Sequence, residues 1–176
     1  MHESCLRPMP SSGAVAWPPP SVRQRQLEHR ALEGLVRTLP NGVPEGTDEA
    51  LCRYLVVRSC GLVEAVRDDA ADFYSKTVGH VRIHRRISQG LRNGLGVTPK
   101  QLLDFVGSFD VAWSDELQSF LLENDGARSN DLGALAAARK KIAHGDGEQV
   151  TTRKALQWSA TADDVANWIL RRFDPR

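Results

Sequence analysis

An arginine and a histidine lie close together in the segment Arg139-Lys-Lys-Ile-Ala-His144-Gly145. A histidine transfers protons near neutral pH, and an arginine stabilises the charge that develops on a phosphate during cleavage. Arg139 and His144 are therefore candidate catalytic residues for cutting RNA without a metal ion. The spacing alone is weak support, because the chain holds 23 Lys and Arg residues and a similar spacing recurs at Arg23 and His29, to which we attach no function.

The surroundings of Arg139 distinguish it from the other occurrence. On a helical wheel of about 100° per residue, Arg139 falls in the middle of an apolar stripe formed by Leu132, Leu135, Ala136, Ile142 and Ala143. A charge there is costly unless it is paired, so the pattern predicts a buried acidic partner or an interface. His144 lies about 140° around the helix, beside Lys140, and Gly145 is the expected C-cap. The alternative is a structural arginine in a buried salt bridge and a surface histidine.

The segment from about residue 48 to 73 is expected to form the central helix of the fold. Its apolar residues occupy two faces, one with Leu51, Leu55, Leu62 and Val66, the other with Tyr54, Val57, Gly61 and Glu64. Glu64 closes the second face, which makes it a candidate acidic partner for Arg139. The alternative is an exposed Glu64 that pairs weakly with a neighbouring arginine such as Arg58 or Arg67.

The run Arg-x-x-Ile-Ala-His-Gly at 139–145 resembles the signature of HEPN domains, and within that superfamily it is most similar to the RiboL-PSP-HEPN type. The upstream run from Tyr54 to Glu64 resembles the first long helix of that group. The similarity covers roughly residues 48–172. Many HEPN proteins carry an asparagine directly after the motif arginine, whereas this chain carries Lys140.

This resemblance implies an all-α, HEPN-type helical bundle that forms a homodimer and acts as a metal-independent endoribonuclease. His144 would move protons at the ribose 2′-OH or the leaving 5′-oxygen, Arg139 would hold the scissile phosphate, and Glu64 and Lys140 would support them. The expected role is that of a toxin or effector in bacterial toxin–antitoxin or antiphage defence, with RNA and an antitoxin or sensor protein as partners. The alternative is a catalytically inactive, HEPN-like dimeric binding module.

A basic stretch supplies further candidate RNA contacts. No acidic residue occurs between Asp72 and Asp104, and the candidate RNA-binding residues Arg82, Arg85 and Arg86 lie there. A solvated helix face is the alternative interpretation. His80 and His84 have the i,i+4 spacing of metal ligands but no accompanying Glu, Asp or Cys, so no metal and no cofactor is predicted.

Composition favours one domain in the cytoplasm. The net charge of +1 creates no strong field, and the three cysteines predict no disulfide framework, Cys52 and Cys60 being expected in the core. No apolar run reaches membrane-spanning length, and no signal-peptide pattern is recognised at the N-terminus. We expect a flexible proline-rich arm at 1–20, a peripheral helix and linker at 21–46, and the HEPN-like helical domain at 47–174.

Further helix boundaries follow from capping patterns. Thr98-Pro99 and Ser114 are expected to begin helices, and Asn124-Asp-Gly126 is expected to end one. Thr161-x-x-Asp164 resembles a capping box at the start of the last helix. Few segments alternate with period two, so no sheet is expected.

Overall fold

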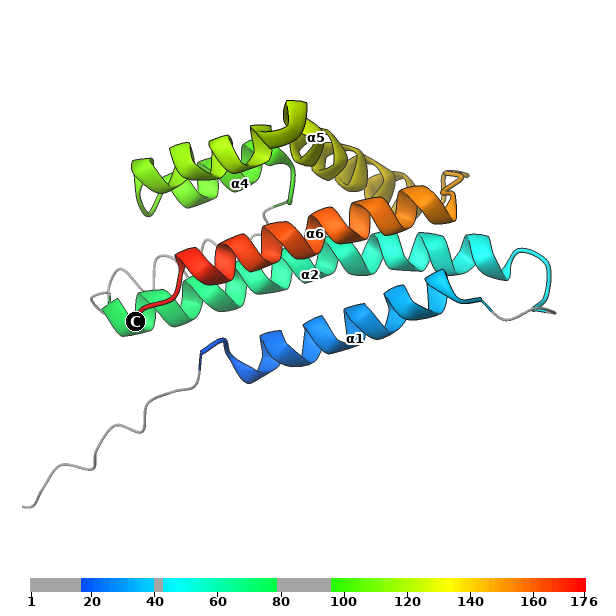
Figure 1. The fold of residues 1–176 in the computed structure, drawn as a ribbon, viewed down its shortest axis with the longest axis horizontal. Helices are drawn as coiled ribbons and strands as arrows, with labels where there is room; N and C mark the ends of the chain where they lie inside the picture. The colour runs from blue at the N-terminus through cyan, green and yellow to red at the C-terminus, as the bar shows by residue number, and fades with distance from the viewer. Residues whose placement is uncertain (1–16, 40–42, 79–95) are drawn as a thin grey trace, which may run out of the picture.

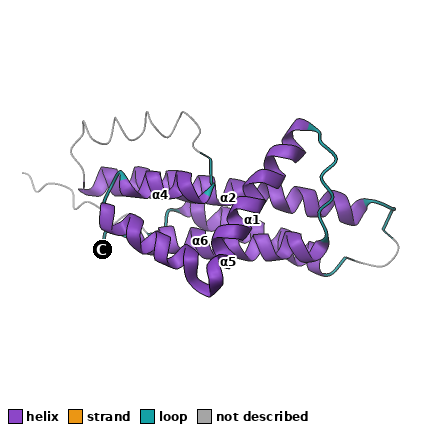
Figure 2. Cartoon of the chain, turned by 90° about the horizontal axis from the view of Figure 1, so that it is seen from above, coloured by secondary structure: helices purple, strands orange, loops and turns teal. Residues whose placement is uncertain are grey.

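The computed structural model describes residues 17–39, 43–78 and 96–176. Within these ranges every regular element is a helix: α1 (Pro20–Arg37), α2 (Thr47–Val78), α4 (Pro99–Gly107), α5 (Val111–His144) and α6 (Thr152–Arg172). Figure 2 shows these helices and the loops between them, with no strand in the described part. The predicted all-α class is confirmed.

Two long helices, α2 and α6, lie side by side through the middle of the bundle (Figure 1). They run in the same direction, and α1 runs the opposite way along them. In the view of Figure 1, α1 lies below this pair, whereas α4 and α5 lie above it. The buried aliphatic side chains of the central pair, including Val56, Val63, Ala162 and Val165, form the middle of the core. The central position predicted for the helix near 48–73 is confirmed, although α2 continues to Val78.

Helix α5 consists of two halves, because Glu123 to Gly126 leave the helical conformation. Asn124, Asp125 and Gly126 take φ angles of 54°, 57° and 74°, so the predicted stop at these residues is confirmed. The Arg128 guanidinium braces the turn by donating to the Glu123 carboxylate at 2.6 Å. The second half of α5, which carries Arg139 and His144, therefore has its own direction toward α2 and α6.

Capping residues explain where two of the helices begin. Helix α4 begins after Thr98, as predicted, and Thr98 and Gln101 form a complete capping box there. Helix α5 begins at Val111 instead of Ser114, because the Asp110 carboxylate accepts from the Ala112 N–H at 2.8 Å. The aspartate thus caps the helix before the serine pattern is reached.

The predicted start of the last helix at Thr161 is wrong. Helix α6 begins at Thr152, and the Thr151 hydroxyl accepts from the Lys154 N–H at 3.3 Å. Thr161 is buried within the helix, where its hydroxyl donates to the Asp131 carboxylate of α5 at 3.2 Å. A threonine and an aspartate three residues apart also occur inside helices. Here the threonine forms a tertiary hydrogen bond to α5 instead of capping a helix.

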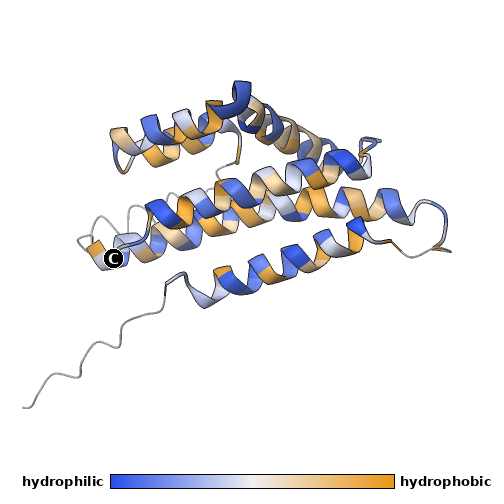
Figure 3. Ribbon diagram, viewed as in Figure 1, coloured by the Kyte–Doolittle hydropathy of each residue, from blue (hydrophilic) through white to orange (hydrophobic). Residues whose placement is uncertain are grey.

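The inward face of α1 carries polar as well as apolar side chains. Leu32 and Val36 are buried, but Leu27 and Leu35 are 61% and 57% exposed. Figure 3 shows many hydrophilic residues along this helix. Two polar side chains, Gln26 and His29, are buried instead, together with Val22. Hydrogen-bond partners on the neighbouring helices thus set which side of α1 faces inward.

The beginning of the described chain is packed against α2. The Trp17 ring lies 5.1 Å from the Phe73 ring, measured between centroids, and Pro20 is the first residue of α1. These positions fall inside the arm predicted at 1–20, so its last residues belong to the packed structure. The remaining part of that arm, residues 1–16, lies outside the described residues.

A buried arginine, Arg67, connects α2 to the segment that precedes α4. Its side chain is 2% exposed, and its guanidinium donates to the Asp68 carboxylate at 2.7 Å and to the Gly96 carbonyl at 2.9 Å. The Phe105 ring lies 5.5 Å from the guanidinium carbon. Burial raises the pKa of Asp68, an effect that the charge of Arg67 opposes. Arg67 thus has its ion pair with Asp68, and a weak surface pair between an exposed Glu64 and Arg67 is not observed.

Candidate functional site

The motif residues Arg139, Lys140 and His144 lie on the last turns of α5 with their side chains exposed. The prediction that Arg139 lies within a buried stripe is wrong. The buried line of this half-helix is formed by Leu132, Leu135 and Ala138. Ala143 is exposed, so counting it as a core residue shifted the centre of the predicted stripe onto Arg139.

None of these three side chains has a hydrogen bond or an ion pair with a residue of the described ranges. The neighbouring Lys141 differs, because its ammonium group lies 2.8 Å from the Glu148 carboxylate. That hydrogen bond raises the pKa of Lys141. Arg139 and His144 thus retain their hydrogen-bonding groups for a ligand or another chain.

The end of α5 is held in place by backbone hydrogen bonds and by an arginine on α2. Gly145 takes a φ of 79°, and its N–H donates to the Ile142 carbonyl at 3.2 Å, which confirms the predicted C-cap. The Asp146 N–H donates to the Lys141 carbonyl at 3.0 Å. Arg53 of α2 donates to the Glu148 carbonyl at 2.9 Å. These contacts give the backbone at His144 a defined position.

Glu64 lies in the neighbourhood of Arg139 but does not pair with it. Both charges act on the buried thiol of Cys60, whose sulfur lies 3.8 Å from the Leu135 carbonyl of α5. Burial, assisted by Glu64 and opposed by Arg139, raises the pKa of this thiol to about 12. Glu64 and Arg139 therefore flank one point of the α2–α5 contact without an ion pair between them. Cys60 remains protonated at neutral pH and is no nucleophile.

A single α5 helix presents Arg139 and His144 in different directions. Five residues of helix separate them by about 140° of rotation and about 7.5 Å of rise. Their chemistry is complementary, since one binds a phosphate group and the other exchanges protons. Joint action on one phosphodiester is simplest when a second α5 helix faces the first and supplies the other residue type.

The structure does not test the predictions for several basic residues. Arg82, Arg85 and Arg86, together with His80 and His84, lie outside the described residues. In the ranges that are described, no three His, Cys, Asp or Glu side chains gather as they would around a metal ion. None of the described helices combines the length and apolarity needed to cross a bilayer.

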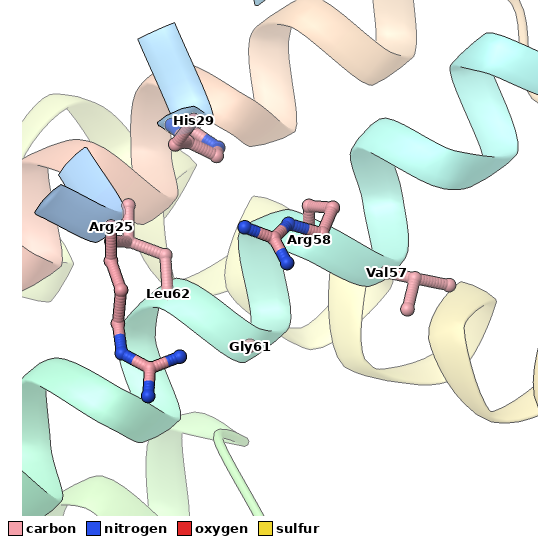
Figure 4. A pocket seen from close by; sticks show the side chains of 6 residues that line it. All are labelled: Arg25, His29, Val57, Arg58, Gly61 and Leu62. Atoms are coloured by element: carbon pink, nitrogen blue, oxygen red, sulfur yellow. The ribbon is translucent and has the colours of Figure 1, made fainter. Parts of the chain in front are cut away.

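Sequence reasoning missed a second candidate site, which lies between α1 and α2. A cavity of about 190 Å³ is lined there by Arg25, His29, Val57, Arg58, Gly61 and Leu62 (Figure 4). The signal was present as an arginine and a histidine one helical turn apart on α1. The other lining residues all come from α2, a different part of the chain, so the sequence alone did not bring the two groups together.

His29 is 2% exposed and connects three helices. Its Nε2 atom lies 3.0 Å from the Ser59 hydroxyl of α2 and 3.2 Å from the Ser159 hydroxyl of α6. Both serines are fully buried, so neither hydroxyl meets a substrate as a nucleophile. Burial lowers the pKa of His29, with a raising effect of the nearby Asp163 as the next contribution.

Comparison of the chain with known protein families, with curated proteins and with solved structures finds no match. The class that the fold defines is therefore an all-helical bundle with an exposed Arg–His pair at the end of one helix.

Proposed function

We propose that this protein is a metal-independent endoribonuclease of the HEPN type, which acts as a homodimer. The observation that carries the proposal is the pair of exposed side chains, Arg139 and His144, without partners in the described chain and located at the capped end of α5. Because neither side chain is engaged by another described residue, both are available for a phosphodiester.

The proposed reaction needs proton transfer and charge stabilisation. One His144 takes the proton of the ribose 2′-OH, whose oxygen attacks the adjacent phosphorus, and Arg139 stabilises the pentacovalent phosphate. The bond to the 5′-oxygen then breaks, and that oxygen receives a proton, from the second His144 of the dimer in this scheme. The products are a 2′,3′-cyclic phosphate and a 5′-hydroxyl, and no water is consumed.

The dimer is proposed because Arg139 and His144 diverge on one helix. Two α5 helices related by a two-fold axis would place an arginine of one copy near a histidine of the other. The exposed side chains around the motif include Ala137 and Ala143, which are small enough for a second helix to approach closely. Lys140 and Glu64 would lie at the edges of this cleft, where Lys140 contributes positive charge toward RNA.

A toxin or effector in bacterial toxin–antitoxin or antiphage defence is the proposed biological role, with an antitoxin or sensor protein as a further partner. It rests on the HEPN resemblance of the 139–145 segment. Slower growth upon expression, relieved by His144→Ala, is the expected result. Equal growth inhibition by the wild type and His144→Ala would favour the inactive binding module.

The test of the enzymatic proposal is cleavage of single-stranded RNA in excess EDTA. The wild type is expected to release fragments with cyclic phosphate ends, and His144→Ala is expected to abolish cleavage. Gln149→Ala, an exposed change in the next loop, is the control and should cleave like the wild type. Activity that is lost with EDTA and returns with a divalent ion would contradict the mechanism. A monomer in light scattering, together with full RNA cleavage at the same concentration, would contradict the shared cleft.

A further inference from the structure

The cavity between α1 and α2 is lined by charged and apolar side chains and by a glycine (Figure 4). Arg25 comes from α1 and Arg58 from α2, so the two cations approach it from different helices. Gly61 has no side chain, and a Cβ atom placed on it would meet nothing within 4 Å. Val57 and Leu62 add apolar surface. The volume of about 190 Å³ exceeds that of one water, about 30 Å³ in the liquid.

The positive charge in this cavity is only partly compensated. Arg58 pairs with Glu28 at 2.9 Å, but both side chains are substantially exposed, at 35% and 49%. Such surface pairs are weak and yield to a stronger anion. Arg25 has no hydrogen bond or ion pair with a described residue. Two guanidinium groups beside one cavity therefore favour a doubly charged anion, which they bind through several N–H groups.

The buried wall of the cavity carries a polar atom without a partner. His29 Nε2 lies within hydrogen-bond distance of the Ser59 and Ser159 hydroxyls, at 3.0 and 3.2 Å. The other ring nitrogen, Nδ1, is buried and has no hydrogen-bond partner in the described chain. Buried polar atoms are rarely left unpaired. Protonation would make both ring nitrogens donors and add positive charge behind the two arginines.

We propose that this cavity binds the phosphate group of a small phosphate monoester, with Arg25 and Arg58 as the binding cations. The apolar side chains of Val57 and Leu62 contact the organic part of the ligand. His29 is a positioning residue that takes up a proton when the dianion arrives. This site lies between α1 and α2, apart from Arg139 and His144 on α5, and it does not depend on the ribonuclease proposal.

The proton uptake of His29 follows from the groups around it. Arg30 of α1 and Arg58 of α2 disfavour the imidazolium, whereas Asp163 of α6 and Glu33 of α1 favour it. Arg25 lines the same cavity. In the unliganded protein burial outweighs the two carboxylates and lowers the pKa of His29. A bound dianion neutralises the arginines, so the affinity for the dianion, corrected for protonation of the ligand itself at about pH 6, should increase as the pH falls from about 8 to about 6.

The experiment is a calorimetric titration of the full chain with phenyl phosphate and with inorganic phosphate at constant ionic strength. Phenyl phosphate should bind at one site, and inorganic phosphate more weakly. Arg58→Gln and Arg25→Gln should each raise the Kd at least about tenfold. Arg23→Gln, an exposed change on the same helix outside the cavity, is the matched control and should change the Kd less than about twofold.

A second variant separates binding from folding. Gly61→Leu places a side chain into the open space of the cavity, so it should fold and yet lose phenyl phosphate binding. Arg139→Lys should bind phenyl phosphate like the wild type, which separates this site from the proposed nuclease site. Equal affinities for the wild type, Arg58→Gln and Gly61→Leu would overturn the proposal. Binding of an RNA oligonucleotide that depends on Arg58, without binding of phenyl phosphate, would overturn it in favour of an RNA surface.

Discussion

Arginine and histidine occur in two contrasting regions of this bundle. Around α2, Arg67 and His29 are buried, and their nitrogen atoms hydrogen-bond to the segment before α4 and to the serines of α2 and α6, respectively. At the end of α5, Arg139 and His144 are exposed and have no partner among the described residues. The first pair holds the structure together, whereas the second leaves its donors and acceptors for another molecule. Residue type alone therefore does not identify a functional site.

The comparison also shows that an arginine beside an apolar helix stripe can be either buried or exposed. Arg67 lies close to the apolar residues of α2 and is buried because Asp68 and the Gly96 carbonyl receive its N–H groups. Arg139 has no such acceptors on α2, since Glu64 does not reach it. A guanidinium without acceptors stays in water, because burying an unpaired charge costs far more free energy than leaving an apolar residue such as Ala143 exposed.

The largest expected effect concerns Arg67. Arg67→Ala should lower the free energy of unfolding by about 3 kcal/mol, because it removes hydrogen bonds to Gly96 and leaves half-buried Asp68 without its cation. Arg139→Ala should change it by less than about 0.5 kcal/mol. Urea denaturation of both variants measures the difference. Similar losses in the two variants would remove the distinction between the buried and the exposed arginine.

The next effect concerns pH. Burial lowers the pKa of His29 below its ordinary value of 6.5 in the folded chain. At pH values below 6.5, His29 binds a proton more often in the unfolded chain than in the folded chain. The free energy of unfolding should therefore fall as the pH decreases from about 7 toward the lowered pKa. His29→Gln should lose this slope. His144→Ala is the control and should retain it. Equal slopes for the wild type and His29→Gln would contradict the assignment to His29.

A smaller effect, in catalysis, sharpens the role of Arg139. Arg139→Lys keeps the charge but lacks the planar fork that grips a phosphate. RNA cleavage should fall at least about tenfold, or about 1.4 kcal/mol of transition-state stabilisation, while thermal stability is unchanged. Arg30→Lys, on an exposed arginine of α1, is the control and should cleave like the wild type. Wild-type cleavage by Arg139→Lys would indicate that the phosphate is held elsewhere.

Much of the helical framework was predictable because its signals are local. The all-α class, the central helix, the stop at Asn124 to Gly126 and the C-cap at Gly145 each depend on residues close together in the chain. Two predicted helix starts were wrong. At Ser114, Asp110 caps the helix four residues earlier, and at Thr161 the threonine hydroxyl donates to Asp131 of α5 from inside the helix. Local patterns do not reveal such competition.

The sequence by itself determined that Arg139 and His144 stand at the end of a helix and diverge around it, because helix geometry needs only spacing. Only the tertiary structure decided that Arg139 is exposed, that Arg67 is buried, and that Glu64 lies near Arg139 without pairing. Tertiary contacts likewise brought Arg25 and Arg58 to one cavity from different helices. The physical reason is that burial and ion pairing depend on which acceptors neighbouring helices supply, and these come from distant parts of the chain.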